Sequence, residues 1–130
     1  MTTWTEAELA TIGATDEVDV ATRRRDGTLR SDRIVWIVRQ EDAVYVRSVL
    51  GATSAWYRGV QSAHAGHLAA GALSRDVVFV EVGDHAAGPA GLDDAIDAAY
   101  VTKYADRWPG PVAQINAPTA RATTLRVDPA

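Results

Sequence analysis

A strand, a glycine turn and the first turn of a helix follow one another in Tyr45-Val46-Arg47-Ser48-Val49-Leu50-Gly51-Ala52-Thr53-Ser54-Ala55-Trp56-Tyr57-Arg58. Small hydroxyl residues lie in the turn, and two aromatic residues and an arginine begin the helix. Backbone N–H groups at a helix N-terminus attract anions, and hydroxyl and guanidinium groups add hydrogen bonds to them. The sequence therefore predicts an anion-binding corner in this stretch, and it names no reaction.

The candidate binding residues are Arg47, Ser48, Gly51, Thr53, Ser54, Tyr57, Arg58 and Trp36. Arg47 and Arg58 are expected to converge on a phosphate or carboxylate, with Tyr57 and Trp36 as an aromatic wall beside it. The alternative is that both arginines are surface residues paired with acids. Trp56 is interpreted as the core anchor of the short helix, whereas anchoring and ring stacking both remain open for Tyr57.

The length and composition limit the classes to which this protein can belong. The 130 residues are enough for one domain, 1–130, with a real core. A net charge of −4 argues against a nucleic-acid partner, and no apolar run reaches the roughly 18 residues of a membrane span. The N-terminus lacks a signal-peptide pattern, so we expect a cytoplasmic protein. Without cysteine, the chain has no disulfide or thiolate site.

The charges are unevenly distributed along the chain. The window Arg23 to Arg58 holds eight arginines against four acids, and the window Asp76 to Asp106 holds seven acids against Lys103. Twelve of the thirteen basic residues are arginine, which suits bidentate recognition of phosphate or carboxylate. The competing explanation is a GC-rich genome, which favours arginine codons.

Local patterns predict the elements around this stretch. Thr5-Glu6-Ala7-Glu8 is a capping box that begins a short helix, and Gly13 ends it. We expect strands at 17–24, 34–38, 43–50, 67–70, 73–82 and 121–127, with an Asp26-Gly27 hairpin turn after the first. Continuous apolar character in 34–38 indicates a strand covered on both faces.

Two further helices are expected. One runs over 54–62; the other, over 92–108, places Leu92, Ile96, Tyr100 and Tyr104 on one face. Residues 83–91 are expected to form a loop, and Pro109-Gly110-Pro111 to break the chain before the last strand. The hairpin-rich order predicts a mainly β fold with short helices, a six-stranded antiparallel split barrel, because closure removes exposed strand edges.

Other candidate sites have weaker support. His64 and His67 are separated by a glycine and His85 stands alone, so we expect no metal site. Asp93 and Asp94 fit helix-start preferences, and Asp97 is expected on the solvated face. Ser48 and Ser54 lack a nearby histidine and a nucleophile elbow, which argues against a serine hydrolase. No catalytic residue is assigned.

Residues along nearly the whole chain resemble the bacterial domain-of-unknown-function family 2255 (DUF2255). They include Trp4 with Glu8-Leu9, the 21–29 hairpin, Tyr45-Val46-Arg47-Ser48-Val49, Gly51, Ser54, Trp56-Tyr57-Arg58, the 94–100 segment, Lys103-Tyr104 and the 121–126 segment. The chain is also similar to the split β-barrel clan of flavin reductases, pyridoxamine-phosphate oxidases and deazaflavin (F420)-dependent nitro- and quinone reductases. This resemblance implies a cofactor, FMN or F420, whose phosphate-bearing tail lies beside the Trp-Tyr helix.

Three functions follow as hypotheses. The first is a flavin- or F420-using oxidoreductase of the nitroreductase or quinone reductase type, in which the cofactor carries the hydride chemistry. The second is a cofactor-free protein that binds or tailors a small hydrophobic or anionic ligand, and the third is a dimerising module without a ligand. Split barrels of this size resemble families that pair across the barrel, so we also expect a homodimer. Ser54, Gly59-Val60 and the single lysine, Lys103, depart from the deazaflavin enzymes' pattern.

Overall fold

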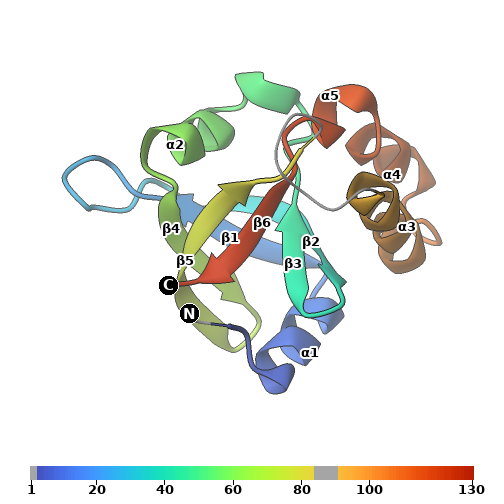
Figure 1. The fold of residues 1–130 in the computed structure, drawn as a ribbon, viewed down its shortest axis with the longest axis horizontal. Coiled ribbons are helices and arrows are strands. Elements are labelled where there is room, and N and C mark those ends of the chain that lie inside the picture. The colour runs from blue at the N-terminus through green and yellow to red at the C-terminus, as the bar shows by residue number, and fades with distance from the viewer. Residues whose placement is uncertain (1–2, 84–90) are drawn as a thin grey trace.

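The computed structural model describes residues 3–83 and 91–130, and Figure 1 shows strands curled into a barrel with helices around it. The strands are β1 (Glu17–Thr22), β2 (Arg33–Gln40), β3 (Ala43–Val46), β4 (Ala65–Ala70), β5 (Leu73–Glu81) and β6 (Leu125–Pro129). They pair antiparallel in the order β1-β2-β3-β6-β5-β4, and β1 pairs with β4 to close the ring. The predicted six-stranded antiparallel barrel is confirmed.

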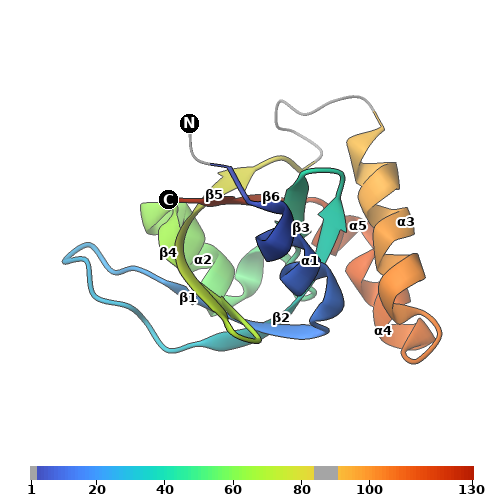
Figure 2. The same ribbon diagram turned by 90° about the horizontal axis from the view of Figure 1, so that it is seen from below.

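The helices occupy the ends and one side of this barrel. They are α1 (Glu6–Ala14), α2 (Ala55–Ala63), α3 (Leu92–Tyr104), α4 (Pro109–Ile115) and α5 (Pro118–Arg121), with a 3-10 turn η1 (Gly51–Thr53) before α2. Figure 1 shows α1 and α2 at opposite ends, and Figure 2 shows α3 and α4 together along one side. The barrel wall therefore has a helix-covered side and open sides.

The main core fills the barrel. Alternate residues of a strand face the same side, so Val35 and Ile37 of β2 point inward and are buried. Leu9 and Ile12 of α1 close one end, and Tyr57 of α2 helps close the other. The capping box of α1 is present: Glu8 N donates to Thr5 Oγ1 and Thr5 N donates to Glu8 Oε1.

A second core lies between the outer face of β2 and β3 and the helices α3 to α5. Ile96, Tyr100 and Tyr104 are completely buried against this face, as their four-residue spacing predicts. Val38 of β2 is buried in the same cluster. The prediction of a strand covered on both faces thus holds for Val35 to Val38, whereas Ile34 at the start of the stretch is exposed.

The structure corrects the prediction for residues 105–124. Helix α3 ends at Tyr104, and Pro109 begins α4, because proline is tolerated in the first turn of a helix, where its missing N–H has no partner to lose. Pro118 begins α5 in the same way. The last strand consequently starts at Leu125 and not at Arg121.

Two other predictions bear on these elements. The third strand is shorter than expected: β3 ends at Val46, and the chain then enters the turn before η1. The expected loop over 83–91, with His85, lies largely outside the described residues. Within the described part of the chain, no helix is both long and apolar enough to cross a membrane.

Candidate functional site

The turn that joins β3 to α2 is held by its own hydroxyl groups. Ser48 Oγ donates to Gly51 O at 2.7 Å and lies 2.7 Å from Ser54 Oγ. Thr53 Oγ1 donates to Leu50 O at 3.1 Å. These hydroxyls have partners inside the turn and stabilise its shape, although Thr53 is exposed.

Gly51 is required at the centre of this turn. Its φ of +74° lies in the left-handed region that side chains disfavour. A Cβ at this position would also lie 2.4 Å from Thr119 Cγ2 of α5. The glycine that the sequence assigned to an anion site thus allows the turn to pack closely against α5.

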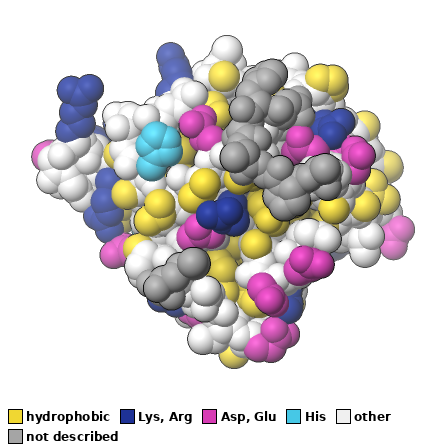
Figure 3. Space-filling view, in the orientation of Figure 1, with side chains coloured by type: hydrophobic (Ala, Val, Ile, Leu, Met, Phe, Trp, Pro, Cys, Tyr) yellow, Lys and Arg dark blue, Asp and Glu magenta, His cyan; other side chains and the backbone are white. Residues whose placement is uncertain are grey.

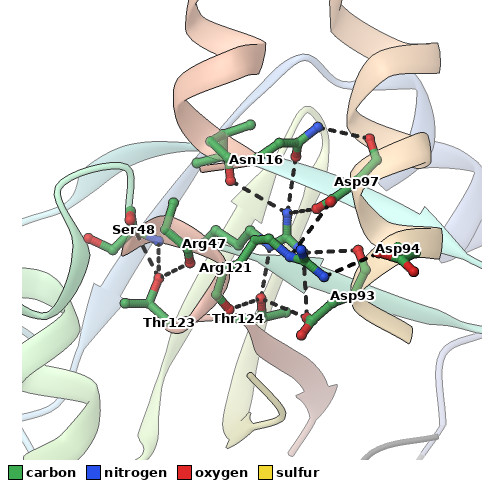
Figure 4. A network of polar contacts seen from close by, with 11 residues as sticks. Arg47, Ser48, Asp93, Asp94, Asp97, Asn116, Arg121, Thr123 and Thr124 are labelled. Atoms are coloured by element: carbon green, nitrogen blue, oxygen red, sulfur yellow. Dashed lines mark hydrogen bonds and ion pairs between the residues drawn. The ribbon is translucent and has the colours of Figure 1, made fainter. Parts of the chain in front are cut away.

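Arg47, which follows β3, is the centre of a buried polar network (Figure 4). Its side chain has no exposed surface. Its Nε donates to Thr124 Oγ1 at 2.8 Å, and its Nη1 donates to Asp97 Oδ1 and to Asn116 Oδ1. Asp93 Oδ1 lies 3.5 Å from Nη2. The guanidinium therefore connects the barrel wall to α3 and to the residue after α4.

This network changes the interpretation of the predicted anion corner. Asp93 and Asp97 balance the charge of Arg47, so its guanidinium is engaged by the protein itself. Arg58 lies on the exposed surface of α2, and the structure does not bring it to Arg47. Asp97, expected on the solvated face, instead pairs with Arg47 and lies 3.6 Å from Arg121 Nε.

The structure decides between the roles that the sequence left open for Tyr57, and it differs from the core-anchor role expected for Trp56. Tyr57 is the core anchor: it is 4% exposed, and its hydroxyl donates to Glu81 Oε1 at 3.0 Å. Burial, and then this hydrogen bond, raise the pKa of Tyr57 to about 12. Trp56 is only partly buried and lines a cavity on the surface.

That cavity, which we call the tryptophan pocket, has a volume of about 260 Å³. Trp36 and Trp56 line it together with Ile34, Val49 and Ile115. It lies beside the helix-covered face of the barrel, where α4 meets the beginning of β2 and the segment after β3. The lining is mainly apolar, as is usual for small-molecule sites.

The polar lining groups are few. Glu17 and Gln114 contribute side chains, and Arg47 belongs to the wall with its guanidinium buried in the network described above. Ile34 is 66% exposed and Val49 is 46% exposed, so apolar surface continues from the pocket to the solvent. Such a cavity offers dispersion contacts with a small number of orienting polar groups.

Trp36 forms one wall of the tryptophan pocket, and its contacts hold the ring in place. Its ring stacks on Tyr104 with 4.1 Å between centroids and 3° between planes. The Tyr104 hydroxyl in turn donates to Asp16 O at 2.7 Å and accepts from Ile37 N at 3.1 Å. Burial raises the pKa of Tyr104 above its ordinary value. The predicted aromatic wall thus includes Trp36, although its partner is Trp56 instead of Tyr57.

Sequence reasoning missed most of this pocket. Pro111, Gln114 and Ile115 belong to α4, which was interpreted as a proline-containing break. No sequence signal marked Ile34 as a pocket residue, because the apolar run 34–38 predicted a covered strand, and its exposure is evident only in the structure.

Histidines take part in local pairing away from this pocket. His67 contacts Asp76 Oδ1 at 3.0 Å and Ser74 Oγ at 2.7 Å through its two ring nitrogens. His64 lies 3.8 Å from a Glu81 oxygen. In residues 3–83 and 91–130, no three histidine or acidic residues come together as a metal site would require.

Solved structures share the fold at low sequence identity. The heme storage protein HutZ from Vibrio cholerae superimposes with a TM-score of 0.65 and 13% identity, over 100% of this chain and 92% of that one. A conserved hypothetical protein from Mycobacterium tuberculosis gives 0.58 and 14%, over 97% and 79%. A protein of unknown function from Agrobacterium tumefaciens gives 0.56 and 13%, over 92% of this chain and 50% of its own length.

Sequence comparison gives the family. No curated protein sequence matches the chain. The model of a family described as an uncharacterized protein conserved in bacteria (DUF2255) matches residues 8–127. Because this match covers nearly the whole sequence, the chain belongs to the DUF2255 family.

Proposed function

We propose that the protein binds a small molecule by holding a flat, largely apolar ring in the tryptophan pocket. The observation that supports this most strongly is the pair of indole side chains, Trp36 and Trp56, that line one cavity with Ile34, Val49 and Ile115. Aromatic walls favour flat ligands because ring stacking adds roughly 0.5–1.5 kcal/mol to the gain from buried area.

The size of the pocket limits what it holds. Its volume of about 260 Å³ is near the lower end of ligand sites, which span roughly 300–1,000 Å³. A ring system fits such a cavity, whereas a complete nucleotide cofactor needs more room. Glu17 and Gln114 provide hydrogen-bonding groups that orient a ring edge.

The ring that we propose is a flavin or a deazaflavin, with FMN or F420 as the cofactor of a nitro- or quinone-reductase type of oxidoreductase. A bound flavin would supply hydride-transfer chemistry, which accords with a pocket that has few acid or base groups. The contribution of this chain would be to stack the ring on Trp36 and Trp56 and to exclude water. The lining residues suit a flat ring. Arg47 is not available to bind the cofactor's phosphate, because protein groups already hydrogen-bond to its guanidinium.

Heme is a less suitable ring for this pocket. The similar Vibrio cholerae structure is that of a heme storage protein. Heme iron needs an axial ligand such as histidine, tyrosine, methionine or cysteine. Among the described residues that line the tryptophan pocket, none is of these types. The alternative to a flavin is a flat small-molecule ligand that is not a cofactor.

The predicted homodimer is also part of this proposal. Leu50 is 69% exposed and continues the apolar surface of Ile34 and Val49 beside the pocket. A second copy placed over this surface would cover it and deepen the pocket, as exposed apolar patches at interfaces do. Sedimentation equilibrium should give twice the 13.9 kDa chain mass. A monomer mass at all concentrations would exclude the dimer.

Riboflavin, which carries no charge, tests the ring site directly. Quenching of its fluorescence should report binding to the wild type. Trp56→Ala should weaken this binding by about tenfold, the equivalent of about 1.4 kcal/mol. Val49→Asp, which places a charge in the pocket wall, should weaken it as strongly.

The matched control is Val101→Asp. Val101 is 50% exposed, similar to Val49 at 46%, and it lies on α3 outside the pocket. This variant should bind riboflavin like the wild type. Equal riboflavin binding by the Val49→Asp and Val101→Asp proteins would refute the ring site, and so would a wild type that binds no flavin.

A further inference from the structure

A second cavity, of about 170 Å³, also has Trp56 in its wall. Three arginines line it, Arg24, Arg30 and Arg33, together with Thr22, Ser31 and the first residue of α2. We call it the arginine pocket. Trp56 borders both cavities, so the two lie beside the same side chain.

The β1–β2 hairpin brings these arginines together. Arg24 N donates to Thr28 O at 2.7 Å across the turn, and Arg30 N donates to Thr22 O at 2.8 Å. Arg33 then pairs with Val20 in the sheet. Figure 3 shows Lys and Arg side chains on and beside this projecting hairpin at the left of the molecule.

Helix α2 packs tightly against the same hairpin. A Cβ on Gly59 would lie 2.4 Å from Thr22 Oγ1 and 3.2 Å from Arg30 Nε. Only glycine permits this approach, so the stem of Arg30 is fixed between α2 and β1. The first turn of α2 begins at the pocket and contains no acidic residue, which leaves its positive end without a countercharge.

Two of the three arginines have guanidinium groups without a partner in the part of the chain that the structure describes. The guanidinium of Arg24 donates to Leu29 O at 2.9 Å and to Thr28 Oγ1. Its charge adds to the Thr28 hydrogen bonds that lower the pKa of Asp26. Arg30 and Arg33 have no such contacts among the described residues.

No acidic residue lines the arginine pocket, and among residues 3–83 and 91–130 no carboxylate lies within ion-pair distance of Arg30 or Arg33. Arg30 Nε is a buried donor without a hydrogen-bond partner in this part of the chain. Burying such a donor is costly unless an acceptor forms a hydrogen bond with it.

Several other arginines of the chain have carboxylate partners. Arg23 is paired with Asp76 at 2.8 Å, and Arg39 with Glu6 at 2.9 Å. Converging arginines without carboxylates are typical of sites that take an anion from solution, because guanidinium groups donate strong paired hydrogen bonds to oxyanions.

We propose that the arginine pocket binds the oxyanion group, a phosphate or a carboxylate, of the ligand whose ring occupies the tryptophan pocket. The inference that one molecule spans both cavities rests on the proposed function. This proposal assigns the anion site to Arg30 and Arg33, whereas the sequence assigned it to Arg47 and Arg58. It also explains how a 260 Å³ ring pocket serves a larger, charged ligand.

The oxyanion site is tested first without any ring. Inorganic pyrophosphate, titrated by calorimetry at low salt, should bind the wild type. Arg33→Gln should weaken this binding by about tenfold or more, since each charge-assisted hydrogen bond lost is worth that much. Arg30→Gln should do the same. Arg25→Gln, an exposed arginine of the same hairpin that does not line the pocket, is the matched control and should bind like the wild type.

The connection between the two pockets is tested by comparing FMN with riboflavin, which differ by the phosphate. The wild type should prefer FMN by about tenfold or more. Arg33→Gln should remove this preference and leave riboflavin affinity unchanged. Circular dichroism and the riboflavin affinity itself check that the variant is folded.

The outcomes separate the two proposals. Equal FMN and riboflavin affinities in the wild type, with no effect of Arg33→Gln, would overturn the inference and leave the ring site standing. Pyrophosphate binding that Arg30→Gln and Arg33→Gln abolish, without any flavin binding, would support the arginine pocket and refute the ring site. Pyrophosphate that binds the Arg33→Gln and wild-type proteins equally would overturn the arginine pocket.

Discussion

Arg47 and the pair Arg30 and Arg33 lie in opposite electrostatic surroundings in this barrel. Arg47 is fully buried and has Asp93 and Asp97 beside its guanidinium. Arg30 and Arg33 line a cavity without a carboxylate in the part of its wall that the structure describes. The number of arginines in a stretch of sequence therefore does not locate an anion site. The presence or absence of neighbouring acids, which comes from distant parts of the chain, distinguishes a structural arginine from one available to a ligand.

The largest expected effect on stability is at Arg47, whose charge Asp93 and Asp97 balance. Arg47→Met should lower the free energy of unfolding by about 3–5 kcal/mol, because it removes a fully buried charge and leaves the part-buried carboxylates of Asp93 and Asp97 without this partner. Urea denaturation measures this. The exposed Arg25→Met should change stability by less than about 0.5 kcal/mol. Adding Asp97→Asn to Arg47→Met should recover part of the loss. A loss below about 1 kcal/mol for Arg47→Met would contradict the structural role.

The next largest effect on stability concerns the packing of α2 against β1 beside Arg30. Gly59→Ala should cost about 1–3 kcal/mol, because the new methyl group overlaps Thr22 Oγ1 and presses on Arg30 Nε. Thr22→Ala removes the oxygen that the methyl group meets. The two substitutions together should then be less destabilising than the sum of their separate effects. Strict additivity in urea denaturation would mean that α2 does not pack on β1 at this point.

Lys103 provides an intermediate case, a buried cation whose contacts are carbonyl groups. Its Nζ donates to Ile37 O at 2.7 Å and to Ile12 O at 3.2 Å. Burial lowers the pKa of Lys103 to about 8. Between pH 8 and the unfolded value near 10.5, the unfolded chain binds the extra proton, so this group makes the folded state more stable as pH rises.

Chemical denaturation at pH 7.5 and pH 9.5 tests this direction. The stability of the wild type relative to Lys103→Met should increase from the lower to the higher pH. The comparison between the two proteins cancels the tyrosines and the other groups that titrate in this range. A difference that stays constant or decreases would show that Lys103 keeps an ordinary pKa.

The smallest expected effect on stability is at Arg30 and Arg33 themselves. Arg30→Gln and Arg33→Gln should each change the free energy of unfolding by less than about 0.5 kcal/mol, because neither side chain has an ion pair to lose within the described part of the chain. The same urea measurement used for Arg47→Met provides the comparison. Losses as large as those of Arg47→Met would mean that these arginines are structural.

The fold was largely predictable because its signals are local. The capping box at Thr5, the Asp26-Gly27 turn and the four-residue spacing of Ile96, Tyr100 and Tyr104 each depend on neighbours in sequence. The helix that begins at Pro109 was missed, since Pro-Gly-Pro is also the pattern of a break, and the four-residue helix that begins at Pro118 is too short to show a helical period in the sequence.

The site was less predictable because it depends on contacts between distant segments. Asp97 and Thr124 approach Arg47 only after α3 and β6 are in place, and no spacing in the sequence shows this. Trp56 and Tyr57 are adjacent, so composition cannot decide which of them faces the barrel core. Trp36 was predicted as an aromatic wall beside the anion corner, and in the structure it lines the tryptophan pocket.

The central claim is that a flat ring binds between Trp36 and Trp56, and the indole N–H signals test it most directly. Trp4 is the internal reference, because its Nε1 donates to Val127 O at 2.9 Å away from the pocket. In two-dimensional ¹H–¹⁵N spectra of the labelled protein, added riboflavin should shift the Trp36 and Trp56 indole signals and leave that of Trp4 in place. Riboflavin that leaves Trp36 and Trp56 unchanged would contradict the account.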